Sequence, residues 1–143
     1  MMEPAQATQC HCQAARQAAR QLTQFYDRHL APTGLRTSQY AVLSRLRRLE
    51  AAGINQLAEA LVMDRTTLGR ALRPLQRDGL VVIGPGSDGR TRALRLTEAG
   101  QARLAAALPL WRHAQDAFED AFGATEAQGL HGAMTRLVLT LPG

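Results

Sequence analysis

Residues 53–97 constrain the fold more than any other stretch of the chain, because two helical patterns follow one another there with almost no room between them. Apolar residues recur at helical spacing over 56–61 and again over 65–77, where Asp64 is the expected N-cap. Val62 and Met63 are left to form the turn. Two helices joined by so short a turn, the second rich in Arg and Thr near its start, are typical of a helix-turn-helix.

A β-hairpin is expected directly after the second of these helices. Residues 80–83 favour a strand, and residues 92–96 alternate between arginine and apolar side chains. Between them, residues 84–89 are turn formers and also match the G-x-G-x-x-G string of dinucleotide-binding proteins. That string needs a helix after it, so that backbone N–H groups meet the pyrophosphate, and here a strand pattern follows. We therefore interpret residues 84–89 as the tip of a wing.

The positive charge of the chain is concentrated on this segment. All seventeen basic residues are arginine, and the formal net charge is +5. Residues 65–95 carry seven arginines against two aspartates, which accounts for the whole +5, because the excesses of the two flanking segments cancel. A solvated charged face is the alternative interpretation, but charge focused in this way suits a polyanion such as double-stranded DNA.

The start of the second helix and the wing carry the residues that we expect to contact DNA. Side chains at the start of a recognition helix enter the major groove, where Arg forks onto guanine and the Thr methyl group contacts thymine. Arg90 and Arg92 would project together toward the minor groove, and Asp88 would orient the Arg90 guanidinium or form the turn. Arg73 and Arg77 are expected to meet phosphate or the protein's own acids. The predicted DNA-binding set is Arg65, Thr66, Thr67, Arg70, Arg73, Asp88, Arg90 and Arg92.

Helical patterns also flank this segment, over 10–30, 37–52, 98–122 and 125–141. The expected N-caps are Thr37 or Ser38, Asn55, Thr97 and Thr125. The outward face of the second helix is expected to hold Arg45, Arg47 and Arg48. The first helix and the last two carry more apolar positions than a three-helix reading domain can cover, so we expect them to pair with a second copy of the chain.

The predicted fold is therefore mainly α with a small β-hairpin wing. We expect a single domain over 1–143, with a winged helix-turn-helix lobe at 36–97 and dimerisation helices at 10–31 and 98–141. The apolar runs are shorter than the roughly 18 residues that span a bilayer. The polar N-terminus lacks the pattern of a secretory signal, so we expect a cytoplasmic protein with no membrane partner.

Five short motifs resemble those of the MarR family of bacterial transcription regulators. They keep the family's order and spacing over nearly the whole chain: Leu57-Ala58 with Leu61, Asp64-Arg-Thr-Thr-Leu68, Arg77-Asp-Gly-Leu80, Asp88-Gly-Arg90 and Leu94-Arg-Leu-Thr-Glu-Ala-Gly100. The departures are Pro74 in the recognition helix and a Gly-rich wing tip. The resemblance implies an obligate homodimer, built from the first and last two helices, that represses transcription from a near-palindromic operator. Two-fold symmetry would place its half-sites about one helical turn apart.

The resemblance also implies a small-molecule effector, bound in the crevice between the dimer helices and the DNA-reading lobe. No residue of the sequence names that effector, and in this interpretation Cys10 and Cys12 are ordinary buried small hydrophobes.

The start of the chain also resembles the organic-hydroperoxide-sensing branch of the family. That branch has a reactive Cys near the head of the first helix and a Tyr fourteen residues later, a spacing that Cys12 and Tyr26 match. A helix N-terminus favours a thiolate, which peroxide oxidises to sulfenic acid. Thr37 stands where the branch has a second tyrosine, and the chain has no distant Cys to resolve a sulfenic acid.

A metal site is a further alternative for the N-terminal cysteines. Its ligands would be Cys10, His11 and Cys12, completed by His29, His113 or His131. Three consecutive residues of a regular helix cannot all surround one ion, and zinc requires four ligands in tetrahedral geometry. We therefore expect no metal and no cofactor. Cysteines two apart on a helix point away from each other, which also disfavours an internal disulfide.

An enzyme is not expected, because the sequence lacks a Ser-His-Asp arrangement, a His-Glu-x-x-His string, a P-loop and paired carboxylates in an apolar setting. The sequence predicts a dimeric, sequence-specific DNA-binding transcriptional regulator, a repressor released by a small molecule. Thiol-based sensing through Cys12, with Cys10 and Tyr26, is the alternative. A protein-interaction module without DNA binding is the alternative from another class, and it predicts no salt-dependent retention on DNA.

Overall fold

The computed structural model describes residues 10–143 and confirms a mainly helical fold with a β-hairpin. Its elements are α1 (His11–Leu30), the short 3-10 helix η2 (Ala31–Thr33), α2 (Thr37–Leu49), α3 (Ile54–Leu61), α4 (Arg65–Arg77), β1 (Val81–Pro85), β2 (Arg92–Leu96), α5 (Glu98–Phe122) and α6 (Ala124–Thr140). The first residues, on which the expected lack of a secretory signal was based, lie outside the described range. Within that range, no helix is long and apolar enough to cross a membrane.

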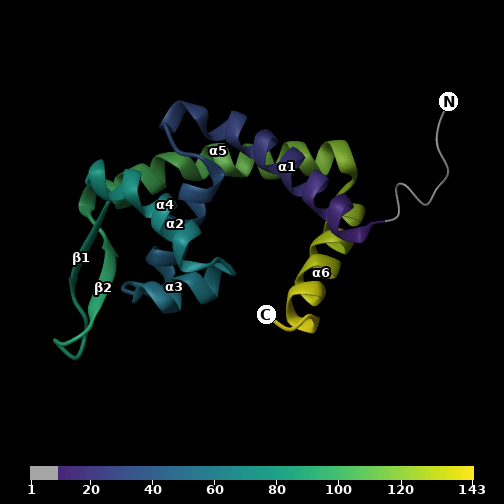
Figure 1. The fold of residues 1–143 in the computed structure, drawn as a ribbon. Coiled ribbons are helices and arrows are strands. Elements are labelled where there is room, and N and C mark those ends of the chain that lie inside the picture. The colour runs from purple at the N-terminus through teal and green to yellow at the C-terminus, as the bar shows by residue number, and fades with distance from the viewer. Residues whose placement is uncertain (1–9) are drawn as a thin grey trace.

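Helix α5 connects the two ends of the molecule. Figure 1 shows α1 lying alongside α5, with α2, α3, α4 and the hairpin gathered at one end of it. Helix α6 packs against the other end of α5 and descends on the same side as the lobe. The hairpin and α6 therefore lie at opposite ends of the chain's longest helix.

The hydrophobic core lies inside the lobe and extends into the long helices. Its fully buried side chains include Leu43, Leu46, Leu57, Leu68 and Leu75, which come from α2, α3 and α4. Spacings of three, four and seven residues place such side chains on one face of a helix. Leu30, Leu104 and Ala107, from α1 and α5, belong to the same core. The lobe is therefore packed onto the long helices through shared apolar contacts.

The start of α2 differs from the prediction. Thr37 is the first helical residue rather than the N-cap, a position that Arg36 occupies. The Asp27 carboxylate of α1 accepts the Thr37 N–H at 2.7 Å, so a neighbouring helix satisfies one of the free N–H groups of α2. A cap supplied by another helix leaves no local signal in the sequence.

Three other helix boundaries differ from the prediction. Helix α2 ends at Leu49 rather than near Ala52, because Ala52 exchanges two backbone hydrogen bonds with Leu94 of β2, at 3.1 and 2.7 Å. Helix α3 begins at Ile54 and helix α6 at Ala124, each directly after a glycine N-cap. Both starts therefore precede the expected N-caps, Asn55 and Thr125. The Asp64 and Thr97 N-cap positions are as predicted.

The two strands form an antiparallel hairpin in which Val81 pairs with Leu96 and Pro85 with Arg92. Strand β1 runs two residues further than predicted, so the tip comprises residues 86–91. The Gly86 N–H closes this tip on the Thr91 carbonyl at 2.6 Å. The dinucleotide string therefore lies on a wing, as the sequence analysis predicted.

Helix α6 presents large apolar side chains to solvent. Leu137 and Val138 are about half exposed, and Leu139 is 80% exposed. Such a surface is expensive to leave in water, which is consistent with the predicted pairing of two copies through the long helices.

Candidate nucleic-acid interface

The helix-turn-helix is formed by α3, a tight turn and α4. Val62 occupies the left-handed region at φ 54° and ψ 47°, and its N–H bonds back to the carbonyl groups of Ala58 and Glu59. Met63 also donates to the Ala58 carbonyl, at 2.9 Å. This conformation reverses the chain within two residues, so α4 packs across α3 with its outer face free.

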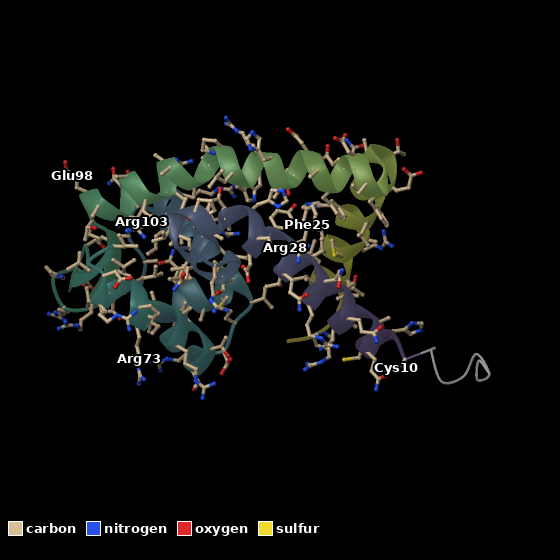
Figure 2. The ribbon with its side chains drawn as sticks, turned by 90° about the horizontal axis from the view of Figure 1, so that it is seen from above. Cys10, Phe25, Arg28, Arg73, Glu98 and Arg103 are labelled. Carbon is tan, nitrogen blue, oxygen red and sulfur yellow. The ribbon has the colours of Figure 1, made fainter. Side chains whose placement is uncertain are left out.

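Burial divides α4 into two faces. Leu68, Leu72 and Leu75 are buried in the lobe core, which fixes the rotation of the helix about its axis. The side chains predicted to contact DNA are all exposed on the rest of the helix: Arg65, Thr66, Thr67, Arg70 and Arg73. Figure 2 shows Arg73 directed away from the body of the protein.

The first turn of α4 holds a carboxylate beside two hydrogen-bond donors. Asp64 has the extended backbone of an N-cap, but its side chain makes no hydrogen bond of normal geometry to the helix backbone. The Thr67 hydroxyl and N–H are nevertheless close enough to lower the pKa of Asp64 below its ordinary value. The ionised carboxylate thus favours the helix start that places Arg65, Thr66 and Thr67 together.

The wing shows which of two roles Asp88 has and corrects the alternation expected of Arg90 and Arg92. The Asp88 carboxylate accepts the backbone N–H groups of Arg90 (2.9 Å) and Thr91 (3.0 Å) and the Thr91 hydroxyl (2.9 Å). It therefore organises the turn, the alternative left open above, and does not hold the Arg90 guanidinium. Arg90 precedes β2, so the expected strand alternation with Arg92 does not apply.

Hydrogen bonds within the wing tip favour the ionised form of Asp88. The Thr91 N–H, the Arg90 N–H and the Thr91 hydroxyl lower the pKa of Asp88. The carboxylate is therefore ionised at neutral pH, and it precedes Arg90 and Arg92 in sequence without forming an ion pair with either guanidinium.

The arginines of this surface are available to a partner. In the part of the chain that the structure describes, the sole ion pair joins Arg77 Nε to Asp78 Oδ1 at 3.4 Å. Arg77 was expected to contact either phosphate or the protein's own acids, and it contacts an acid. Arg73 and the other arginines predicted to contact DNA form no ion pair with a carboxylate of residues 10–143. The face formed by α4 and the wing therefore presents uncompensated positive charge.

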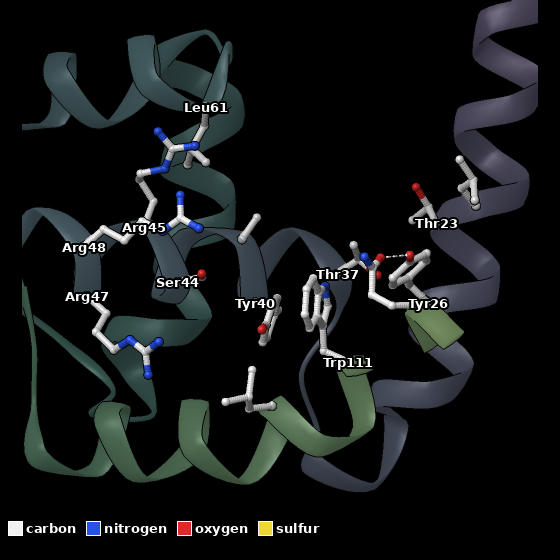
Figure 3. Close-up of a pocket in the computed structure, with 14 residues that line it drawn as sticks. Thr23, Tyr26, Thr37, Tyr40, Ser44, Arg45, Arg47, Arg48, Leu61 and Trp111 are labelled. Atoms are coloured by element: carbon white, nitrogen blue, oxygen red, sulfur yellow. Dashed lines mark hydrogen bonds between the residues drawn. The ribbon is translucent and has the colours of Figure 1, made fainter. Parts of the chain in front are cut away.

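A crevice lies where the lobe meets the long helices. It has a volume of about 520 Å³ and is lined by residues of α1, α2 and α5, with Leu61 of α3 at its edge. Tyr40 of α2 and Trp111 of α5 stack in it, with ring centroids 6.1 Å apart and planes inclined by 16°. Figure 3 shows these rings beside Thr37 and Tyr26. The crevice therefore joins an aromatic wall to polar groups from two other helices.

Three arginines of α2 also line this crevice. Arg47 and Arg48 are exposed, as expected of an outward face, and Arg45 is partly buried. All three also line the crevice, because α1 and α5 cover one side of α2. None of them pairs with a carboxylate of residues 10–143. Burial raises the pKa of Tyr40, and the charges of Arg47, Arg112 and Arg48 oppose that rise.

Comparison with known proteins assigns the chain to a family. The model of the MarR family matches residues 35–82. An HTH-type transcriptional regulator of Bacillus cereus is 30% identical over 118 residues, which cover 82% of this chain and 79% of that protein. The chain belongs to the MarR family. It is a transcriptional regulator, as predicted, and not an enzyme.

Two solved DNA complexes contain proteins whose fold is similar to that of this MarR-family chain. The Mycobacterium tuberculosis regulator MosR, in complex with DNA, is 34% identical with a TM-score of 0.75, and the match covers 93% of this chain and all of that one. The transcriptional repressor CouR, bound to a DNA duplex, has a TM-score of 0.84 over 96% of this chain and 99% of its own, at 21% identity. The second likeness concerns the fold alone.

The N-terminal cysteines of this MarR-family chain lie far from the wing. Cys10 is the N-cap of α1 and accepts the Gln13 N–H at 3.5 Å through its sulfur, and Cys12 lies in the first turn. Figure 2 shows Cys10 at the end of the molecule opposite the hairpin. Both thiols are free and exposed in this chain, so the expectation that they are buried is wrong for the single chain.

Cys12 and Tyr26 do not meet within one chain. Their positions on one continuous helix are about 21 Å apart along its axis, at 1.5 Å per residue. The Tyr26 hydroxyl instead donates to the side-chain oxygen of Gln115 on α5. Among residues 10–143, no three His, Cys, Asp or Glu side chains are grouped as metal ligands.

The crevice was expected from the resemblance to the MarR family, but none of its lining residues was assigned to it. The signals present were the only tryptophan of the chain, Trp111, and three arginines close together on one predicted helix. A solvated charged face explains such a cluster equally well until the neighbouring helices are placed.

Proposed function

We propose that this chain is a homodimeric repressor that holds double-stranded operator DNA with α4 and the wing. A small molecule bound in the crevice would release it. The observation that carries the proposal is the crevice itself, because its walls come both from the DNA-reading lobe and from the long helices. A molecule that fills it therefore contacts both parts at once, and differential contact is what shifts a conformational equilibrium.

The DNA-contacting role of the lobe is supported by its charge and geometry. The exposed face of α4 carries Arg65, Arg70 and Arg73, and no described carboxylate neutralises them. A two-fold dimer would present two such helices to successive major grooves, as helix-turn-helix dimers do. The DNA complexes of MosR and CouR belong to proteins of the same architecture.

Dimerisation through 10–31 and 98–141 is supported by the exposed apolar surface of α6 and by the alanines of α1. Leu137, Val138 and Leu139 gain from burial only if a second chain covers them. Small residues on α1 allow another helix to approach closely. Analytical ultracentrifugation should give a dimer, and Leu137→Glu together with Leu139→Glu should give monomers with weakened DNA binding.

Fluorescence anisotropy on DNA upstream of the protein's own gene tests the proposal. Binding should weaken steeply as salt rises, because phosphate contacts release counterions. A ligand that fills the crevice should quench or shift the emission of Trp111 and release the DNA over the same concentration range. A protein-interaction module would show no salt-dependent retention on any duplex, and that result would overturn the proposal.

Thiol-based sensing is the second candidate, favoured by the exposure of Cys12 in the first turn of α1. The Cys12 thiolate would attack one oxygen of an organic hydroperoxide, forming the sulfenic acid and releasing the alcohol. Organic peroxide should then release wild-type protein from DNA but leave Cys12→Ser bound. If peroxide affects both proteins equally, the cysteine is not the sensor.

A further inference from the structure

A groove lies between α4 and the wing, next to the face that is proposed to contact DNA. Its volume is about 360 Å³. Apolar side chains of α3, α4 and the hairpin line it: Ile54, Leu72, Ile83, Ala93 and Leu94. Its other lining residues are Gly69, Arg73 and Gln76 of α4 and Arg92 of β2. The groove therefore continues the exposed face of the recognition helix toward the wing.

The α4 side of the groove has a gap at Gly69. Arg65, Gly69 and Arg73 are four residues apart, so they follow one another along one face of the helix. A Cβ at Gly69 would meet no atom of residues 10–143 within 4 Å. The packing of the described chain therefore does not require a glycine between the two arginines.

This glycine also makes the helix less stable than alanine would. Gly69 lies near the middle of α4, where glycine lowers the folding equilibrium about fivefold relative to alanine. Its φ is not positive, so the turn does not need the conformational freedom of glycine either. Glycine is, however, the residue that lets a ligand approach the backbone closely. A partner that enters the gap would account for the missing side chain.

The groove has an unpaired arginine on each side. Arg73 of α4 and Arg92 of β2 line it, and neither forms an ion pair with a carboxylate of residues 10–143. Arg95 lies on the other face of β2, opposite Val82, and donates to the Pro85 carbonyl at 3.5 Å. Guanidinium groups bind phosphate oxygens in a forked geometry, and the apolar lining suits the carbon atoms of deoxyribose. The groove is thus complementary to a sugar-phosphate strand.

We propose that one strand of the DNA backbone lies in this groove, between the major groove that α4 enters and the minor groove beside the wing. Arg73 and Arg92 bind phosphates of that strand from its two sides, and Gly69 lets the strand approach the helix. The inference rests on the proposed function. It adds a positioning role for Gly69, and it gives Arg92 a phosphate contact in place of the minor-groove contact expected from the sequence.

Filling the gap tests the role of Gly69. Gly69→Ala and Gly69→Leu should raise the melting temperature by about 2–4 °C, because both residues favour a helix more than glycine does. The same variants should bind DNA more weakly, and Gly69→Leu should lose about tenfold or more, the effect of losing a charge-assisted contact. Phosphate contacts carry no base information, so DNA from upstream of the protein's own gene and an unrelated duplex should be affected alike in anisotropy titrations. Weaker binding by a more stable protein excludes impaired folding as the cause.

Neutral methylphosphonate groups, placed one at a time along the duplex, test the two arginines. In wild type, substitution of the phosphate held in the groove should weaken binding at each half-site. Arg73→Ala and Arg92→Ala should each reduce the salt slope by about 1 per half-site and become insensitive to substitution at that phosphate or its neighbour on the same strand. Arg95→Ala is the matched control, because Arg95 belongs to the same β-strand but does not line the groove, and it should keep the wild-type pattern.

Four outcomes would contradict the proposal. Wild-type affinity in Gly69→Leu would overturn it, and so would an effect confined to the cognate duplex, because the gap would then face a base pair. Loss of sensitivity on different DNA strands in Arg73→Ala and Arg92→Ala would show that the two arginines do not share a strand. An Arg92→Ala variant that keeps the wild-type phosphate pattern but loses a preference between A·T and G·C pairs would place Arg92 in the minor groove.

Wild-type protein separates these outcomes from failure of the proposed function. If wild type shows no salt-dependent binding to either duplex, the proposed function is wrong, and the strand in the groove is excluded with it. If wild type binds and the variants give one of the four outcomes above, the assignment of the groove alone is wrong.

Discussion

The carboxylate of Asp27 on α1 accepts two hydrogen bonds from Thr37, the first residue of α2, with Oδ1 2.7 Å from both N and Oγ1. A second link lies nearby, where Arg103 of α5 donates to the Thr33 carbonyl at 3.1 Å. These polar links and the shared apolar core attach the DNA-reading lobe to the long helices. Thr37 also lines the crevice, so this attachment is within reach of a bound ligand.

Asp27→Ala should lower the free energy of unfolding by about 1–2 kcal/mol, the cost of losing a helix cap. Asp27→Asn keeps an acceptor for the Thr37 N–H and should cost less. Urea denaturation at one fixed protein concentration measures both. Asp116→Ala is the control, because it removes an exposed carboxylate of α5 that makes no hydrogen bond within residues 10–143. Equal losses in Asp27→Ala and Asp116→Ala would contradict the capping role.

Local patterns predicted the DNA-reading lobe well, because its signals lie close together in the chain. Asp64 before an apolar stripe and Thr97 before Gly100 each mark a helix start within four residues. The cap of α2 was missed because Asp27 lies ten residues away on another helix. The early end of α2 was missed for the same reason, since Ala52 is taken up by pairing with Leu94.

The candidate sites also differ in how far the sequence could predict them, depending on whether their residues are close together in the chain. The periodicity that buries Leu68, Leu72 and Leu75 also leaves Arg65 and Arg70 outside, so the exposed face of α4 could be predicted from sequence. The lining residues of the crevice could not be predicted, because Tyr40 and Trp111 are far apart in the sequence and meet only when α2 packs on α5. The turn role of Asp88 could be predicted, because its hydrogen-bond donors are the backbone N–H groups of residues two and three positions later.

Val62→Gly should stabilise the protein or leave it unchanged, even though it removes a side chain. Val62 has φ 54° and is 71% exposed, so a β-branched residue is strained there and little packing is lost. Relief of the left-handed conformation is worth about 1 kcal/mol, partly offset by the entropy of an unfolded glycine. Val82→Gly, at an exposed position of β1, should instead destabilise by roughly 1 kcal/mol. Thermal denaturation of the two variants distinguishes these effects, and equal destabilisation would contradict the strain.

Gly100→Ala should be among the most damaging single-methyl additions. A Cβ at Gly100 would lie 2.1 Å from the Leu80 carbonyl oxygen, so α5 or the start of the wing must move. Overpacking of this kind costs about 1–3 kcal/mol. Gly129→Ala, in α6 with no atom near its Cβ, should stabilise by about 0.5–1 kcal/mol through helix propensity. Calorimetric melting of both variants is the measurement, and a stable Gly100→Ala would show that this contact yields easily.

The wing tip should loosen in acid. The pKa of Asp88 is lowered in the folded protein by the Thr91 and Arg90 donors, so its contribution is present above the unfolded pKa, ordinarily near 3.8. It is lost as the pH falls below that value through the folded pKa. The amide proton shifts of Arg90 and Thr91, followed by NMR, should titrate in this window and be constant in Asp88→Asn. Asp64 also has a lowered pKa, so a whole-protein melting curve would mix the two groups.

Arg70→Ala and Arg90→Ala should weaken operator binding in different ways. Arg70 lies on the exposed face of α4, and loss of a base contact costs roughly 1–3 kcal/mol, or about tenfold to a hundredfold in affinity, with relaxed preference at one base pair. Arg90 lies at the wing, so its loss should weaken cognate and unrelated duplexes alike and reduce the salt slope by about 1. Arg112→Ala removes the same charge from the exposed surface of α5 and should change neither sequence preference nor the salt slope. Anisotropy titrations on both duplexes over a range of salt provide the comparison. If Arg70→Ala weakens both duplexes equally, α4 contacts phosphate at this position, and base reading must come from another residue of the same face.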